Sequence, residues 1–201
     1  MRLGIFGGTF DPPHVGHLLA ATDATEQLSL DRLVFVPAAV QPLKAHRSTA
    51  TGGDRLLMIR LTAGDEPRFA ADSIELDRDG LSYTVDTLGE FARRFPLADR
   101  YFLVGADVLA TFAQWRDPRA VLELATLAIL TRRSDGGDVP DASREGGVLA
   151  EEIAKRSTVV QTRRIDVSST EIRERVRTGR SIRGFVTDGV AEYISSHGLY
   201  R

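Results

Sequence analysis

The sequence has no cysteine among its 201 residues, which excludes disulfide bonds, thiolate nucleophiles and cysteine-ligated zinc or iron–sulfur sites. Long apolar runs are also missing, because none approaches the roughly 20 residues that a membrane-spanning helix needs. The apolar run within residues 1–7 is too short for a signal peptide. We therefore expect a cytoplasmic protein that has no membrane partner.

A strong charge of either sign is missing as well. The chain carries 26 basic and 28 acidic residues, so its formal net charge is −2, and only two of the basic residues are lysines. Between Arg163 and Arg183, however, seven arginines accompany only three acids. A local cluster on a nearly neutral protein favours a small anionic ligand over nucleic acid, which usually needs a broader basic surface.

Short β-rich apolar segments alternate with segments of helical periodicity. This alternation predicts βαβ units, and therefore an α/β fold with a parallel sheet covered by helices on both faces. The expected strands are Leu3–Phe6, Arg32–Pro37, Phe69–Leu76, Tyr101–Gly105, Leu127–Leu130 and Thr158–Arg164. The expected helices are Gly16–Leu28, Asp54–Ala63, Thr84–Phe95, Val108–Trp115 and Arg119–Ala125.

The last third of the chain differs in pattern. Residues 134–147 are rich in Gly, Asp and Ser and lack periodicity, which indicates a surface loop. Residues 169–178 and 188–197 have helical patterns, each followed by a glycine. No composition shift divides the chain, so we expect a single domain over residues 1–201, with residues 168–201 as its C-terminal helical part.

The segment Gly-Gly-Thr-Phe-Asp-Pro-Pro-His-Val-Gly-His, residues 7–17, lies between the first expected strand and the first expected helix. Ligands bind at the carboxyl ends of strands in open α/β sheets. There Gly7 and Gly8 let backbone N–H groups approach a phosphate, and the helix N-terminus adds partial positive charge. His14 and His17 are three residues apart, so both imidazoles can face one point. This segment predicts an anion-binding site.

A second polar segment begins the helix expected at residues 169–178. Ser168, Ser169 and Thr170 offer hydroxyl and N–H groups at the helix N-terminus, and Arg173 follows one turn later. On its own this pattern is more typical of a helix cap than of a ligand site.

Together, these two segments resemble the paired signatures of the H-x-G-H nucleotidyltransferases, the adenylyl- and cytidylyltransferases that have a Rossmann-like fold. Further segments resemble one bacterial family, the nicotinate-nucleotide adenylyltransferases. They are Ser-Tyr-Thr-Val-Asp-Thr-Leu at 82–88, Gly-Ala-Asp at 105–107 with Trp115 downstream, Arg132-Arg133, and the ending from Tyr193 to Arg201. Leu43 departs from the pattern, since the family usually has a histidine before the lysine that matches Lys44.

The resemblance implies transfer of an adenylyl group from ATP to nicotinate mononucleotide, with Mg²⁺ arriving on ATP and no metal site formed by the protein. The implied catalytic residues are His14, His17, Lys44 and Arg173. The implied ATP-binding residues are Gly7, Gly8, Thr9, Phe10, Gly105, Asp107, Ser168, Ser169 and Thr170. The implied mononucleotide-binding residues are Tyr83, Thr84, Thr87, Trp115 and Arg133.

Physical chemistry is consistent with several of these roles. Asp107 follows a strand, where an acid can accept hydrogen bonds from a ribose diol. Trp115 offers a flat face to a pyridine ring, although a lone tryptophan is as often simply part of the core. Backbone N–H groups of Tyr83 and Thr84 can bind the nicotinate carboxylate, which would be costly to bury without a partner.

Two alternatives remain. One is pantetheine-phosphate adenylyltransferase, which shares both signatures but is usually shorter and is not expected to have the segment at 82–88. The other is a non-catalytic nucleotide-binding module on the same fold. Turnover distinguishes the two classes, because a binding module would hold ATP without releasing pyrophosphate. The oligomeric state is open, and a homo-oligomer is one possibility.

Overall fold

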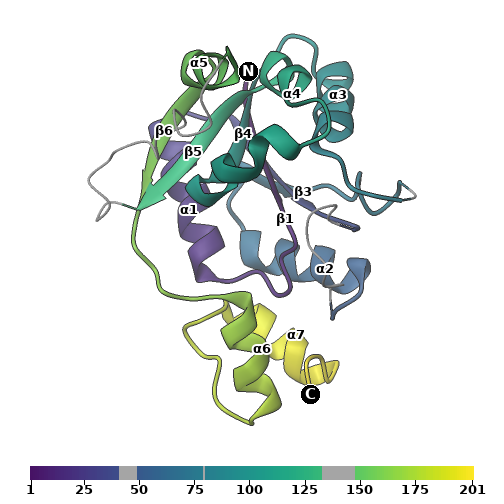
Figure 1. Ribbon diagram of the computed structural model, residues 1–201. Coiled ribbons are helices and arrows are strands. Elements are labelled where there is room, and N and C mark those ends of the chain that lie inside the picture. The colour runs from purple at the N-terminus through teal and green to yellow at the C-terminus, as the bar shows by residue number, and fades with distance from the viewer. Residues whose placement is uncertain (41–48, 79, 133–147) are drawn as a thin grey trace.

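A parallel sheet forms the centre of the computed structural model, which describes residues 1–40, 49–78, 80–132 and 148–201 (Figure 1). Within these residues the sheet has six strands in the order β3-β2-β1-β4-β5-β6. The strands are β1 (Arg2–Gly8), β2 (Arg32–Pro37), β3 (Phe69–Ala71), β4 (Asp99–Gly105), β5 (Thr126–Arg132) and β6 (Ser157–Thr162).

Helices cover both faces of this sheet, which confirms the expected α/β class. One face is covered by α1 and α2, and the other by α3, α4, α5 and the 3₁₀ helix η1 (Figure 1). The helices are α1 (Val15–Gln27), α2 (Gly52–Ala63), α3 (Thr84–Arg94), η1 (Ala106–Gln114), α4 (Pro118–Leu124), α5 (Val148–Lys155), α6 (Ser169–Arg177) and α7 (Asp188–Ser196).

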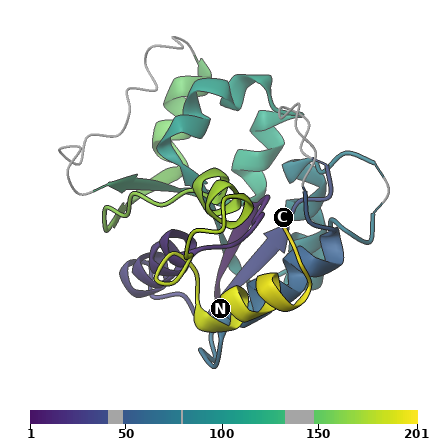
Figure 2. The ribbon, with the colours of Figure 1, turned by 90° about the horizontal axis from the view of Figure 1, so that it is seen from below.

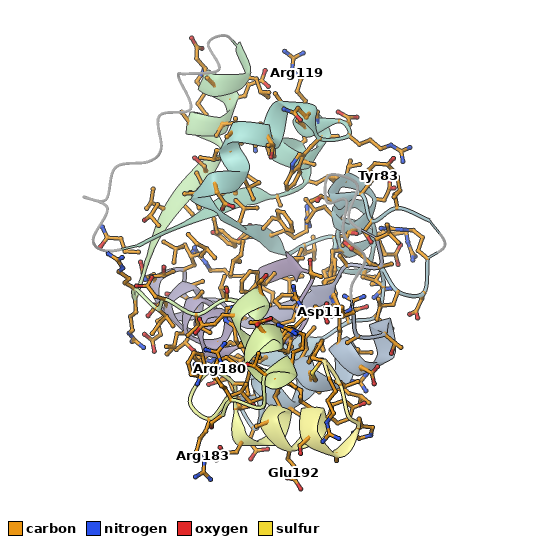
Figure 3. All side chains as sticks on the ribbon, turned by 60° about the horizontal axis from the view of Figure 1, so that its bottom comes forward. Asp11, Tyr83, Arg119, Arg180, Arg183 and Glu192 are labelled. Atoms are coloured by element: carbon orange, nitrogen blue, oxygen red, sulfur yellow. The ribbon has the colours of Figure 1, made fainter. Side chains whose placement is uncertain are left out.

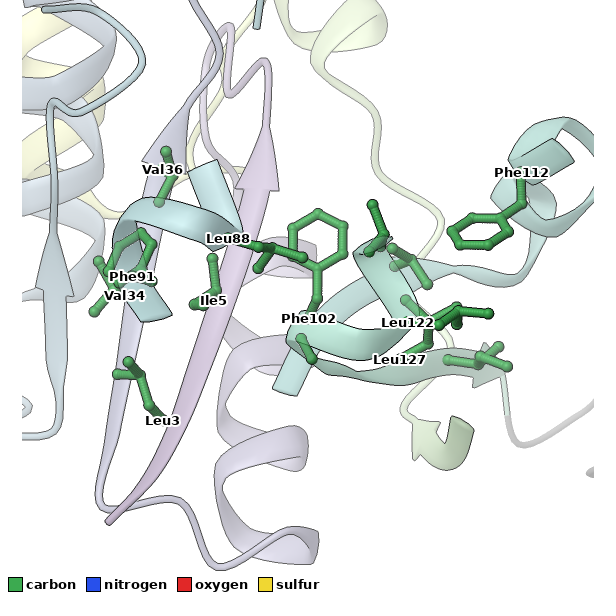
Figure 4. Close-up of a cluster of buried hydrophobic side chains, with 14 of the residues drawn as sticks. Leu3, Ile5, Val34, Val36, Leu88, Phe91, Phe102, Phe112, Leu122 and Leu127 are labelled. Carbon is green, nitrogen blue, oxygen red and sulfur yellow. The ribbon is translucent and has the colours of Figure 1, made fainter. Parts of the chain in front are cut away.

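Two apolar clusters hold the helices to the sheet, because successive strand residues point to opposite faces. Val34 and Val36 of β2 point toward the α3 side, where Leu88 packs with them in one buried cluster (Figure 4). Leu33 and Phe35 point toward α1 and α2 and belong to the second cluster. The layers on both faces therefore position the carboxyl ends of the strands rigidly.

The strand order places a crevice at the carboxyl ends of the two central strands. From β1 the chain proceeds outward to β2 and β3, and then crosses over to β4, β5 and β6 on the other side. Connections leave β1 and β4 in opposite directions, which is the place where open α/β sheets bind ligands.

The C-terminal helices lie beyond this sheet edge. Figure 2 shows α7 lying alongside α2, with α6 next to it. Met58 of α2 forms a third buried cluster with Ile172 of α6 and with Val190 and Ile194 of α7. This cluster attaches residues 168–201 to the sheet domain, mainly through α2.

The structure also corrects several expectations. The third expected strand, Phe69–Leu76, ends at Ala71, because the Asp72 carboxylate accepts the Ile74 N–H at 2.9 Å and turns the chain. The helix expected at 108–115 is a 3₁₀ helix beginning at Ala106, and α5 was not foreseen. The loop expected at 134–147 lies outside the described residues. No helix in the described ranges has both the length and the apolarity to cross a bilayer.

Candidate active site

A cavity of about 280 Å³ opens at the crevice between β1 and β4. Its floor is formed by strand ends, including Gly7 and Gly8 of β1 and Gly105 of β4. Tyr83 and Thr84, which begin α3, contribute one wall, and Trp115 contributes another. The structure therefore brings together six of the residues that the sequence assigns to the two substrates.

Aromatic packing holds Trp115 in place at the cavity wall. Its ring lies 5.2 Å from the Phe112 ring and 6.2 Å, edge to face, from the Phe102 ring, measured between centroids. Trp115 is only partly buried, because it also lines the cavity. The sequence left a core role and a stacking role open, and the structure accommodates both.

The N-terminus of α3 is the main polar feature of the wall. Tyr83 is the N-cap residue and its side chain makes no capping hydrogen bond, so no N-cap side chain satisfies the N–H groups of the first turn, although Asp86 in that turn partly offsets the helix dipole. The Arg116 guanidinium lies 4.7 Å above the Tyr83 ring and 3.4 Å from the Asp86 carboxylate. An anion at this wall would meet the N–H groups of the helix start and the Arg116 guanidinium, whose charge the Asp86 carboxylate partly offsets. The sequence reasoning missed Arg116, although it directly follows the tryptophan.

Thr87, assigned from the sequence to the mononucleotide, lies behind this wall and does not line the cavity. Its side chain is 1% exposed, and its hydroxyl donates to Glu75 Oε1 at 2.7 Å. Burial raises the pKa of Glu75, while hydrogen bonds from Thr87 and Ser82 oppose the rise. Ser82 in turn accepts the Ala39 N–H at 2.9 Å. Glu75 thus ties together the residues that flank Tyr83 and Thr84, a role that the sequence reasoning missed.

The two histidines meet at the start of α1, as the sequence predicts. Their rings stack with centroids 3.7 Å apart, and His17 Nδ1 accepts the backbone N–H of His14 at 3.2 Å. Because Nδ1 is an acceptor, the proton of the neutral His17 ring is assigned to Nε2. Burial lowers the pKa of His14 to about 4, so this imidazole is neutral at physiological pH. The neutral His14 ring and the Nε2 side of the His17 ring can each offer an N–H group to a ligand.

Close packing around the loop that joins β1 to α1 explains why Gly8 and Gly16 are glycines. A Cβ on Gly8 would lie 2.9 Å from the Phe10 ring, and one on Gly16 would lie 3.0 Å from His14 Nδ1. Phe10 itself has a left-handed backbone with φ of 50° and is almost fully buried. The loop that carries the histidines is therefore tightly constrained.

The second polar segment contacts the first, although the two lie at opposite ends of the sequence. Ser169 Oγ donates to the carbonyl of Pro12 at 2.8 Å, and Arg173 donates to the carbonyl of Asp11 at 2.7 Å. Ser168 is the N-cap of α6, because its hydroxyl accepts the Glu171 N–H at 3.1 Å. Thr170 Oγ1 accepts from Arg173 at 3.3 Å. Both the capping and the site interpretations of this segment are therefore compatible with the structure.

The remaining sequence-predicted residues fall into two groups. Thr9 lies in the loop before the histidines, and Asp107 is exposed in the first turn of η1, just after Gly105. Lys44 and Arg133 lie outside the described residues.

Much of the arginine cluster has structural partners. Arg177 pairs with Glu174 at 2.7 Å and Arg163 with Asp23 at 3.4 Å. Arg175 donates to the Ser181 carbonyl at 2.7 Å. These three arginines are therefore engaged within the chain, and the small anionic ligand expected for the cluster stays a prediction.

A central crevice lined by strand-end glycines, a helix N-terminus and an aromatic face lies where open α/β sheets bind ligands, and the comparison with known families gives the class of protein. Residues 5–175 match the cytidylyltransferase-like family model, and the chain belongs to this family.

The curated relatives narrow the assignment. The chain is 50% identical over 205 residues to a probable nicotinate-nucleotide adenylyltransferase of Gemmatimonas aurantiaca, covering 100% of this chain and 93% of that protein. It is 42% identical to a probable nicotinate-nucleotide adenylyltransferase of Thermus thermophilus, covering 100% of each. Within the cytidylyltransferase-like family, the chain is a member of the nicotinate-nucleotide adenylyltransferases.

Solved structures confirm the fold. The nicotinic acid mononucleotide adenylyltransferase of Plasmodium falciparum, complexed with NaAD, superposes with a TM-score of 0.76 at 17% identity, covering 99% of this chain and 97% of that chain. A putative nicotinate-nucleotide adenylyltransferase of Vibrio parahaemolyticus gives a TM-score of 0.63 at 23% identity, covering 100% and 96%.

Proposed function

We propose that the chain transfers the adenylyl group of ATP to nicotinate mononucleotide, forming nicotinate adenine dinucleotide and pyrophosphate. A phosphate oxygen of the mononucleotide forms a bond to the α-phosphorus of ATP, and the bond from that phosphorus to the bridging oxygen of pyrophosphate breaks. The observation that carries the proposal is the cavity beside Trp115 and the α3 N-terminus. This cavity opens at the carboxyl ends of β1 and β4, and β1 leads into the histidine loop.

The reaction needs no general base from the protein. The second pKa of a phosphate monoester is about 6, so the attacking oxygen is already largely ionised at neutral pH. Catalysis then depends on positioning and on stabilising the charge of the transition state. We assign His14 and His17 to the α- and β-phosphates, which their shared position at the α1 N-terminus supports.

Nicotinate mononucleotide would occupy the cavity with its pyridine ring against Trp115. Backbone N–H groups of Tyr83 and Thr84 at the α3 N-terminus would bind the carboxylate, with the Tyr83 N–H exchanging its 3.1 Å hydrogen bond to the Leu81 carbonyl for one to the substrate. A neutral amide gains less from the helix dipole, so we expect the acid to be preferred. Thr87 acts indirectly, by holding this helix start in place through Glu75. Arg133 is assigned to the mononucleotide phosphate from the sequence resemblance alone.

ATP would lie along the loop from Gly7 to Phe10, with its ribose diol near Asp107 beyond Gly105. The segment Ser168–Thr170 and Arg173 would complete the phosphate site from the C-terminal side. Their hydrogen bonds to the Asp11 and Pro12 carbonyls support this position beside the loop. Lys44 is assigned to the leaving pyrophosphate from the resemblance alone.

Magnesium fits this scheme as part of the substrate. Within the described residues no group of three or more His, Asp or Glu side chains is arranged to hold a metal. We therefore propose that Mg²⁺ arrives on ATP with most of its water ligands. It neutralises phosphate charge there, while the histidines and the helix N-termini orient the phosphates.

The test is pyrophosphate release from ATP and Mg²⁺ with three acceptors assayed in parallel: nicotinate mononucleotide, nicotinamide mononucleotide and phosphopantetheine. Fast release with the first, and clearly slower release with the second, is the expected result. Equal rates with both mononucleotides would keep the reaction and refute the carboxylate assignment. Release with phosphopantetheine alone would indicate pantetheine-phosphate adenylyltransferase, and ATP binding without release would indicate a binding module.

The substitution His17→Ala tests the phosphate assignment. We expect kcat to fall about a hundredfold or more, because a donor aimed at transition-state charge is lost. Circular dichroism should show an unchanged fold. A variant with near-normal kcat would exclude His17 from the chemistry.

A further inference from the structure

The loop that precedes the histidines is held from three distant parts of the chain. Arg55 of α2, which is 2% exposed, donates to the Thr9 carbonyl at 2.7 Å. Arg173 of α6 donates to the Asp11 carbonyl at 2.7 Å. The third contact comes from the end of the chain, where the hydroxyl of Tyr200 donates to Asp11 Oδ1 at 2.7 Å across 189 residues. Figure 3 places Asp11 close to the C-terminal helices.

Asp11 is the point where these contacts converge. Its side chain is 4% exposed, and its carboxylate accepts four hydrogen bonds. Oδ2 accepts the backbone N–H and the hydroxyl of Thr49 at 2.8 and 2.9 Å, and Oδ1 accepts the Ala50 N–H at 3.1 Å in addition to Tyr200. A buried carboxylate needs such donors, and each hydrogen bond to a charged acceptor is stronger than a neutral one.

Phe10, the neighbour of Asp11, connects the loop conformation that is held at Asp11 to the proposed reaction site. Phe10 has a φ of 50°, a backbone region that is unfavourable for a residue with a side chain and persists only where the surroundings hold it. Its ring packs edge-on against the His17 imidazole, with centroids 5.0 Å apart, and against the backbone of Gly8. A relaxation of this loop would therefore displace both His17 and the main chain assigned to the phosphates.

We propose that Tyr200 is a positioning residue for adenylyl transfer, acting through the Asp11 carboxylate on Phe10 and His17. The proposal rests on the function proposed above. The end of the chain thereby sets the geometry of a loop near its beginning. This role extends beyond the resemblance of the ending to the family, which says nothing of what Tyr200 contacts.

The chain offers a matched control in Tyr193 of α7. Its hydroxyl donates to Asp54 Oδ1 at 2.9 Å, so it also joins the C-terminal segment to α2 through a tyrosine–aspartate pair. Asp54 caps α2 together with Thr51, and the hydrogen bonds given for its carboxylate come from Thr51 and Tyr193. Tyr193→Phe therefore removes the same chemical group from the same segment without touching Asp11.

The experiment compares wild type, Tyr200→Phe and Tyr193→Phe by denaturant unfolding and by steady-state kinetics, with ATP and nicotinate mononucleotide varied in turn. We expect both variants to unfold more easily. Only Tyr200→Phe should lower kcat, by about tenfold, or about 1.4 kcal/mol of activation free energy. Its KM for nicotinate mononucleotide should change less than about twofold, because that substrate's wall at Trp115 and Tyr83 is built by other contacts.

A double-substitution cycle with Asp11→Asn tests the route of the effect. If Tyr200 acts through the carboxylate, adding Tyr200→Phe to Asp11→Asn should produce much less than the tenfold loss it causes alone. Equal kcat for the two tyrosine variants, or full additivity in the cycle, would overturn the proposal.

Failure of the proposed function would give a different experimental result from failure of the Tyr200 proposal. In that case wild type itself would release no pyrophosphate with nicotinate mononucleotide. The role of Tyr200 is then tested by calorimetric binding of a non-hydrolysable ATP analogue, which Tyr200→Phe should weaken relative to Tyr193→Phe. Equal affinities of the two variants would overturn it.

Discussion

The buried histidine at the α1 N-terminus makes the stability of the protein depend on pH in a way that can be calculated. Burial lowers the pKa of His14 from 6.5 to about 4 in the folded chain. In the unfolded chain the ring is exposed to water and takes up its proton near pH 6.5. Between these two values the unfolded state binds more protons than the folded state, so stability rises with pH.

The direction of the effect and the pH range over which it occurs follow from these two pKa values. The stability contributed by a neutral His14 is fully present above pH 6.5 and is lost as the pH falls through 6.5 toward 4. At about 1.4 kcal/mol per pKa unit, the full loss is about 3 kcal/mol. This is a large fraction of the 5–15 kcal/mol that typically stabilises a domain.

The assay is denaturant unfolding of wild type and His14→Gln at closely spaced pH values from 7.5 to 4.5. Glutamine keeps a polar side chain at the site but cannot titrate. We expect the free energy of unfolding of the wild type to fall more steeply than that of the variant with decreasing pH below 6.5. Parallel curves across this range would refute the burial argument and, with it, the assignment of a neutral imidazole to His14.

Three further changes test other parts of the structure. Trp115→Phe should raise the KM for nicotinate mononucleotide about three- to tenfold in steady-state kinetics, because a smaller ring offers less stacking; an unchanged KM would restrict Trp115 to the core. Glu75→Gln should raise the same KM, about tenfold, with little change in the KM for ATP, since the Thr87 hydroxyl loses its charged-acceptor partner behind the Tyr83 wall; equal effects on both KM values would contradict this. Thr51→Ala should cost about 1 kcal/mol of unfolding free energy in a denaturant titration, through the lost α2 cap, and should leave kcat unaltered; a lower kcat would connect this cap to the site.

The sequence predicts the elements whose signal is local. The apolar runs of β1, β2, β4 and β5 are continuous and end at glycine, proline or a charged residue, so each is recognised from a few neighbouring residues. The carboxyl-end rule then places the histidine loop at the sheet edge without knowledge of the packing. Where local polar chemistry competes, the prediction fails, as at Asp72, whose carboxylate turns the chain and ends β3.

The parts of the site that the sequence misses depend on long-range pairing. Nothing in the local pattern indicates that Tyr200 reaches Asp11 or that Arg55 is buried against the Thr9 carbonyl. Glu75 lies in a segment expected to be a strand, and a carboxylate in a strand is expected to face solvent. Only the folded chain shows that it is buried between Thr87 and Ser82.

The function proposed for the chain is transfer of the adenylyl group of ATP to nicotinate mononucleotide at the β1–β4 crevice. The most direct measurement is a competition in a single tube, with ATP limiting and with equal nicotinate mononucleotide, nicotinamide mononucleotide and phosphopantetheine, followed by chromatographic analysis of the products. We expect that nicotinate adenine dinucleotide dominates and forms in equal amount with pyrophosphate. Dominance of either other adenylylated product, or pyrophosphate formed without a dinucleotide, would contradict it.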